Sequence, residues 1–182
     1  MNAPMKKAVL TVGSLVFLAI PSANSAERDA PLDPSCAIVN RAYANTRATE
    51  LYGGLMFEAK ADGSYVPIRE YRFRKNAVFR RWVPGEWREE RRVNPPLSYS
   101  SGPRFSDCRQ IDSPTPQSKP GRYAAKWYGA PYTGKVEVWL MPDELKLERV
   151  LVTYDEHFRP APYVSQLELF SYDPDNTEFP KP

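Results

Sequence analysis

The chain has 182 residues, of which 42% are hydrophobic and 26% are charged, and its formal net charge is +3. Two of its lysines, Lys6 and Lys7, lie in a predicted leader, so that 23 basic and 22 acidic residues, a net charge of +1, remain beyond it. A nearly neutral chain gives no overall electrostatic argument for binding nucleic acid.

The first 26 residues have the three parts of a secretory signal peptide. Lys6-Lys7 precede an apolar run from Ala8 to Ile20, and the small residues that follow allow cleavage after Ser25 or after Ala26. The apolar run is too short to span a bilayer, although an uncleaved anchor is the alternative. We therefore expect a signal peptide over 1–26 and a single exported, soluble domain over 27–182.

The chain has two cysteines, Cys36 and Cys108. In an oxidising compartment the simplest prediction is one disulfide between them. A redox-active thiol pair is the alternative, but the C-x-x-C spacing that such pairs favour is absent.

Asp33-Pro34 predicts the start of a helix, because aspartate accepts hydrogen bonds from free amides and proline has no amide hydrogen to leave unpaired there. The helix is expected to run from Pro34 to about Thr46, or as far as Leu51, with Gly53-Gly54 ending it. Its apolar side must pack on another element, since a helix of this length is marginal alone.

The rest of the chain is rich in short segments of alternating hydrophobic and polar residues, the pattern of β-strands. The segment beginning at Trp87 is the exception, since WREERR favours a helical turn. We expect seven or eight strands with short turns, hence an α+β fold in which one N-terminal helix packs on a mostly antiparallel sheet. The expected strands include 55–60, 77–82, 105–111, 122–128, 135–141, 145–154 and 163–172.

No motif predicts catalysis or metal binding. His157 is the only histidine, and the usual zinc sites need three or four ligands. Neither a G-x-S-x-G motif nor a glycine-rich phosphate loop is present. Paired carboxylates of a glycosidase are an alternative that the spacing does not support. We therefore expect no catalytic residues, no metal and no cofactor.

A basic cluster between residues 69 and 92 contains nine basic and four acidic residues. Arginine interleaved with aromatic residues can bind an anionic group, and Arg80, Arg81, Arg88 and Arg91 are the candidates for an anion-binding rim. The alternative is that these arginines form the solvated face of the sheet and protect its edge from aggregation.

Tyrosine, tryptophan and phenylalanine number 11, 4 and 8 residues, and many fall on predicted strands. A curved sheet lined with such rings makes a pocket for an apolar ligand. The candidate residues are Phe57, Tyr71, Phe73, Trp127 and Trp139. A filled core is the alternative.

The order of these signals resembles a known group of proteins. It comprises the leader, Cys36 in the first turn of a helix, a meander carrying Phe79-Arg80-Arg81-Trp82, then Asp107-Cys108-Arg109 and a closing Phe170-Ser171-Tyr172-Asp173. This layout is similar to small exported proteins of Gram-negative bacteria and to the outer-membrane lipoprotein-carrier superfamily. The resemblance implies a half-open antiparallel barrel wrapped over an N-terminal helix, a periplasmic location, and binding of acyl chains or other hydrophobic ligands.

The first functional hypothesis is therefore a non-enzymatic periplasmic carrier with an apolar cleft for a lipid or another hydrophobic molecule. The alternative is an envelope protein-interaction or structural module with a filled core, and a cell-wall hydrolase is a third, weaker one. Expected partners are a hydrophobic small molecule or an envelope protein, with no nucleic acid and at most peripheral contact with the membrane.

Overall fold

The computed structural model describes residues 32–74, 77–91, 104–111, 121–129, 132–141, 145–155, 163–173 and 175. The predicted leader over 1–26 and the single histidine, His157, lie outside this part of the chain. Within it, no helix is both long and apolar enough to cross a membrane.

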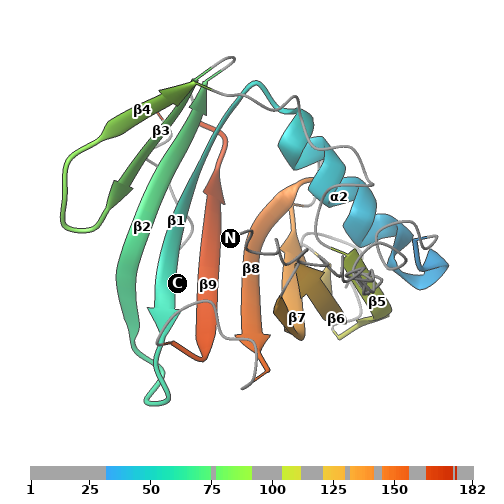
Figure 1. Cartoon of the computed structure of the whole chain (residues 1–182). Coiled ribbons are helices and arrows are strands. Elements are labelled where there is room, and N and C mark those ends of the chain that lie inside the picture. The colour runs from blue at the N-terminus through green and yellow to red at the C-terminus, as the bar shows by residue number, and fades with distance from the viewer. Residues whose placement is uncertain are drawn as a thin grey trace, which may run out of the picture.

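The described residues form one open sheet of nine strands in the order β4-β3-β2-β1-β9-β8-β7-β6-β5 (Figure 1). Every neighbouring pair is antiparallel. The predicted α+β class and antiparallel sheet are confirmed, but the predicted number of seven or eight strands is too low. The strands are β1 (Leu51–Ala59), β2 (Tyr65–Arg74), β3 (Ala77–Trp82), β4 (Arg88–Arg91), β5 (Arg104–Gln110), β6 (Arg122–Gly129), β7 (Tyr132–Leu140), β8 (Leu147–Tyr154) and β9 (Ser165–Ser171).

The ninth strand is β4, where the sequence favoured a helical turn. Its residues Arg88–Arg91 are all charged and show no alternation of hydrophobic and polar side chains. The strand forms because β3 offers a free edge, on which Arg88 pairs with Arg80 and Arg91 pairs with Ala77. Tertiary pairing therefore overrides the local pattern.

One short 3₁₀ turn, η1 (Pro34–Cys36), leads into the helix α2 (Ala37–Ala48). Asp33 caps this segment as predicted, since its Oδ1 accepts the backbone N–H of Ser35 at 2.8 Å. The helix ends at Ala48 rather than at Gly53-Gly54, because both glycines already belong to β1. Its buried side chains are those of Val39, Asn40, Ala42 and Thr46.

The end of α2 is hydrogen-bonded to the start of β8. Thr46 Oγ1 accepts the backbone N–H of Leu147 at 2.9 Å and lies 2.8 Å from the hydroxyl of Tyr172. That hydroxyl donates to the carbonyl of Leu147 at 2.7 Å. Asn45 Nδ2 donates to the carbonyl of Leu145 at 3.0 Å. These bonds fix where the helix crosses the sheet.

The start of the helix is fixed by a disulfide, as predicted. Cys36 and Cys108 are bonded, with Cα atoms 5.0 Å apart. Beside the bridge, Asp33 Oδ2 accepts the N–H of Asp107 at 2.9 Å, and Ser35 Oγ accepts the N–H of Cys108 at 3.1 Å. The hydrogen bond from Asp107 is the main cause of the lowered pKa of Asp33. Together these contacts attach the helix to the edge strand β5.

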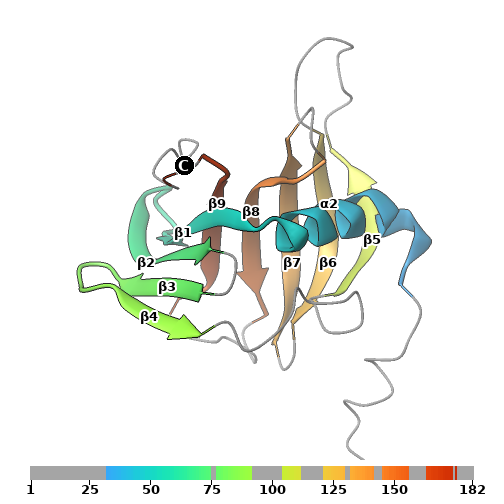
Figure 2. The same cartoon turned by 90° about the horizontal axis from the view of Figure 1, so that it is seen from above.

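We call the side of the sheet on which α2 packs the inner face. Seen from above, α2 lies over β8, β7, β6 and β5, while β2, β3 and β4 turn toward the same side at the other end (Figure 2). The inner face and α2 enclose the main core, which includes Val39, Ala42, Val136, Val138 and Val150. A smaller cluster of Phe57, Leu167 and Leu169 lies on the opposite, outer face.

Candidate functional site: the inner face of the sheet

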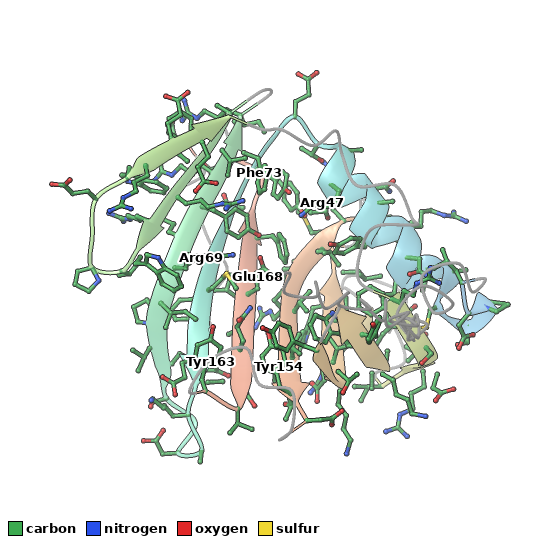
Figure 3. The ribbon with its side chains drawn as sticks, in the orientation of Figure 1. Arg47, Arg69, Phe73, Tyr154, Tyr163 and Glu168 are labelled. Carbon is green, nitrogen blue, oxygen red and sulfur yellow. A yellow bond between two sulfur atoms is a disulfide. The ribbon has the colours of Figure 1, made fainter. Side chains whose placement is uncertain are left out.

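Two charged side chains lie at the centre of the inner face. Met56 of β1 stands directly opposite Arg69 of β2 on one side and Glu168 of β9 on the other. Directly opposite residues of antiparallel strands point to the same face, so Arg69 and Glu168 flank Met56 on the inner face. Figure 3 shows both side chains in the middle of this face, with Arg47 and Phe73 above them and Tyr154 and Tyr163 below.

Tyr71 connects β2 to Glu168 across the intervening strand. Its hydroxyl donates a hydrogen bond to Glu168 Oε1. The tyrosine ring lies over Gly54 of β1, where an added Cβ would be only 2.0 Å from the ring carbon that bears the hydroxyl. A residue without a side chain is therefore required at position 54 for Tyr71 to reach Glu168.

Glu168 ionises less readily than an ordinary glutamate. Burial raises its pKa above the usual 4.5, while the hydrogen bond from Tyr71 and the positive charges of Arg69 and Arg47 oppose the rise without cancelling it. Burial also raises the pKa of Tyr71 well above its usual range, and the neighbouring Glu168 charge adds to the effect. The surroundings of both groups therefore disfavour negative charge.

Aromatic rings surround this polar centre. Tyr52 stacks on Phe73 with 4.5 Å between the ring centroids. Trp127 meets Tyr154 edge to face at 5.6 Å, and Tyr132 meets the same ring at 6.4 Å. Burial raises the pKa of Tyr154 and that of Tyr163. Aromatic rings therefore lie on both sides of Arg69 and Glu168 on the inner face.

One side of α2 contributes further polar groups. Asn40, Tyr43 and Arg47 are spaced three and four residues apart and so share a helix face. The guanidinium of Arg47 lies 5.8 Å from the ring centroid of Phe73, which places this face toward the inner site. Asn40 is 6% exposed, and its Nδ2 has no hydrogen-bond acceptor among the described residues. Burial raises the pKa of Tyr43 to about 12.

A basic pocket lies at the β2–β4 end of the sheet. It has a volume of about 430 Å³, and its charged and aromatic lining residues are Arg69, Arg80, Arg81, Trp82, Glu86, Arg88 and Glu90. Arg69 lies over the ring of Trp82 at 5.9 Å, and Arg80 forms an ion pair with Glu90 at 2.9 Å. Arg69 therefore belongs both to this pocket and to the centre of the inner face.

The outer face carries two tryptophans, each between two arginines. Trp87 has Arg72 at 4.6 Å and Arg81 at 4.8 Å from its ring centroid. Both arginines also form ion pairs with Glu70, at 3.2 Å and 2.6 Å, although Glu70 is only 6% exposed. The second set is Arg122, Trp139 and Arg149, with distances of 4.9 Å and 5.6 Å to the ring.

The structure does not gather the five aromatic residues of the predicted apolar site. Tyr71, Phe73 and Trp127 belong to the main core on the inner face. Phe57 packs with Leu167 and Leu169 on the outer face, and Trp139 lies between its two arginines there. The cause is the alternation of side chains along a strand, which the sequence could not assign to one face or the other.

Three residues of the predicted anion-binding rim, Arg80, Arg81 and Arg88, line the basic pocket. Arg80 and Arg88 stand directly opposite each other. The guanidinium of Arg81, the next residue after Arg80, binds Glu70 and Trp87 on the outer face. The backbone of Arg91 pairs with Ala77, and its side chain lies outside the described part of the structure.

Three inner-face residues were not among the predicted site residues: Glu168, Arg69 and Arg47. A signal for Glu168 is visible in the sequence, because it stands in the run Leu167-Glu168-Leu169-Phe170, where every neighbour is apolar. A charged residue within such a strand, with both faces of the sheet covered, is either paired or functional. Arg69 was part of the predicted basic cluster, but nothing distinguished it from its neighbours.

Replacing Glu168 by glutamine is expected to change how stability depends on pH. The pKa of Glu168 is higher in the folded state than in the unfolded chain, so protonation of Glu168 stabilises the folded state. This stabilisation is fully present below about pH 4.5 and is lost as the pH rises through the folded-state pKa. Glutamine keeps an acceptor for Tyr71 but cannot ionise. The stability of Glu168→Gln relative to the native protein should therefore increase with pH, as measured by urea unfolding across this range. Parallel pH curves for the two proteins would contradict this prediction.

Among the described residues, no group of three or more histidine, cysteine, aspartate or glutamate side chains is arranged to hold a metal ion. In comparisons with known proteins, no family model matches the chain, and the search of curated proteins gives no match either. The function is therefore inferred from the geometry of the inner face.

Proposed function

We propose that this protein is a non-enzymatic binding protein of the exported, periplasmic carrier type, which holds a lipid or another hydrophobic molecule on the inner face. In this proposal the curved sheet and α2 form a half-open barrel like that of the outer-membrane lipoprotein-carrier superfamily. The ligand occupies the part of the inner face between α2 and the β2–β4 end.

The observation that carries the proposal is the environment of Glu168. Burial raises the pKa of this side chain, and yet the side chain keeps some solvent-accessible surface. A side chain in a close-packed core keeps almost none, so the combination is typical of a residue that lines an internal space. Phe73 and Tyr163 on the same face are likewise only partly buried.

The position of α2 supports the same proposal. The helix packs mainly on β5, β7 and β8. In the described part of the chain, no helix covers β1, β2 and β9 on the inner side, where Tyr71, Arg69 and Glu168 lie (Figure 1). Concave surfaces lined by aromatic side chains with a few polar groups are characteristic of small-molecule sites.

The proposal is tested by titrating the purified protein with N-phenyl-1-naphthylamine, a neutral apolar probe whose fluorescence rises in apolar surroundings. We expect saturable binding that weakens about tenfold in Tyr163→Ala, because a partly buried ring contributes roughly 1.5 kcal/mol of apolar contact. The control is Trp139→Ala on the outer face, which should bind the probe like the native protein.

Native mass spectrometry and lipid extraction of protein purified from periplasm provide an independent measurement. We expect an apolar molecule to co-purify with the native chain. If no lipid is extracted and the probe shows no fluorescence change, the protein is not a carrier of this type.

An envelope protein-interaction module is the second candidate, favoured by the side chain of Trp82. This large hydrophobic residue is 66% exposed on β3, and exposed tryptophans beside arginines are common at the centres of protein interfaces. Reversing the charges of Arg80, Arg81, Arg88 and Arg91 separates the candidates. Loss of a co-purifying protein, with probe binding unchanged, would favour the interaction module.

A further inference from the structure

We infer that the ligand of the inner face is an anionic amphiphile, whose charged head group binds in the basic pocket at Arg69 while its apolar part extends toward Tyr154 and Tyr163. This inference rests on the proposed function and specifies the chemical class of the ligand. The head group is a carboxylate or a phosphate, which arginine recognises through the same hydrogen bonds.

Strand register places three of the four arginines of the pocket, all except Arg81, on the ligand's side of the sheet. Tyr71 of β2 stands directly opposite Arg80 of β3, and Arg80 stands directly opposite Arg88 of β4. Since opposite residues share a face, both arginines lie on the face where Tyr71 binds Glu168. Arg69 stands opposite Trp82 on the same face. The pocket is therefore the margin of the inner site.

Arg69 has hydrogen-bonding capacity that the described protein does not use. Its Nε is buried and has no acceptor among the described residues. A buried donor without an acceptor is costly, and a carboxylate or phosphate oxygen in the pocket would satisfy it. Arg80 is already paired with Glu90, whereas Arg88 forms no ion pair in the part of the chain that the structure describes. Arg69 and Arg88 are thus the cations available to a head group.

The charges deeper in the site also favour an anion. Arg69 and Arg47 both act electrostatically on Glu168, whose pKa is nevertheless raised by burial. Two permanent positive charges therefore face one carboxylate that ionises reluctantly. The site therefore has a net positive potential, which attracts an anionic ligand and has no such effect on a neutral one.

Arg69 connects the pocket to the apolar part of the site. The charge of Arg69 acts on the hydroxyl groups of Tyr163 and Tyr154, while its guanidinium lies 5.9 Å from the ring centroid of the exposed Trp82. Figure 3 shows Arg69 between the upper part of the inner face and the two tyrosines. One elongated molecule can therefore contact the arginine with its head group and the tyrosine rings with its chain.

The experiment compares three ligands of equal chain length, decyl phosphate, decanoate and decanol, as competitors of N-phenyl-1-naphthylamine on the full chain. We expect the two anionic ligands to displace the probe at about tenfold lower concentration than decanol, because a charge-assisted hydrogen bond is about twice as strong as a neutral one. The advantage should shrink as salt is added.

Two sets of variants locate the effect. Arg69→Gln should remove most of the preference for anionic ligands. The second set is the double variant Arg80→Gln and Arg88→Gln. It should reduce this preference and leave the fold intact, because both side chains are exposed. Arg149→Gln is the matched control. Like Arg69, Arg149 is a partly buried arginine with an unpaired Nε beside a tryptophan, but it lies on the outer face and its replacement should change nothing.

Each other outcome overturns the inference in a distinct way. If the probe binds but decanol competes as well as decyl phosphate, the inference fails and the proposed function stands. If the probe does not bind, both fail. If inorganic phosphate alone displaces decyl phosphate as effectively as decanoate does, the pocket binds a free anion instead. If a glutamate-rich peptide does so, the pocket binds an acidic protein.

Discussion

Replacing Cys36 and Cys108 together by serine is expected to lower the free energy of unfolding by about 4 kcal/mol, according to the chain-entropy model of loop closure. The bridge joins residues 72 positions apart, so its loss frees a long segment of the unfolded chain. It also detaches η1 from the edge strand β5. The measurement is urea unfolding of the variant and of the native protein.

The control for this experiment is the native protein in a reducing agent. Because the chain contains no other cysteine, reduction acts on this bridge alone and should reproduce the stability of the double variant. A double variant that unfolds at the same urea concentration as the oxidised native protein would show that the backbone hydrogen bonds to Asp33 and Ser35 are sufficient to hold η1 in place.

Replacing Gly54 by alanine is expected to destabilise the protein by about 3 kcal/mol, the sum of overpacking and of the lost hydrogen bond to a carboxylate. The new Cβ would lie 2.0 Å from the Tyr71 ring, so the ring must move and its hydroxyl must leave Glu168. The measurement is again urea unfolding, with circular dichroism to show that the sheet is retained.

A double-mutant cycle with Tyr71→Ala isolates this effect. Once the ring is removed, Gly54→Ala should cost little, and the coupling free energy between the two positions should be about 2 kcal/mol or more. If Gly54→Ala costs the same with and without the ring, the glycine is needed for the strand itself and not for the passage of Tyr71.

The sequence was sufficient to predict structural elements that are determined by residues close together in the chain. Asp33-Pro34 predicts the helix start, because capping is decided within one turn. The presence of only two cysteines predicts a single disulfide between them. Alternation predicts most strands, but β4 has no alternation, and it forms only because β3 offers hydrogen bonds to its backbone.

The candidate site was harder to predict because it depends on which strands become neighbours. Arg69 and Glu168 are separated by almost a hundred residues, and they approach each other only because β1 lies between β2 and β9. In the sequence, nothing distinguishes Arg69 from the other arginines of the basic cluster, and the apolar neighbours of Glu168 indicate a buried carboxylate without identifying its partner. For the same reason Phe57 and Trp139 could not be distinguished from Tyr71 as candidates for the apolar site. The alternation of side chains along a strand separates two faces but does not identify the inner one.

The position of β9 has a consequence for how the molecule assembles. Among the described strands it is the last to be synthesised, yet it lies between β1 and β8 in the middle of the sheet. Before residues 165–171 are synthesised, strands β1–β4 and strands β5–β8 are two separate sets, and the backbone N–H and C=O groups of β1 and β8 that later pair with β9 have no partner. Such free edges pair with strands of other chains. A nascent polypeptide that stops short of Ser165 is therefore expected to aggregate, and synthesis must pass this point before the sheet can close.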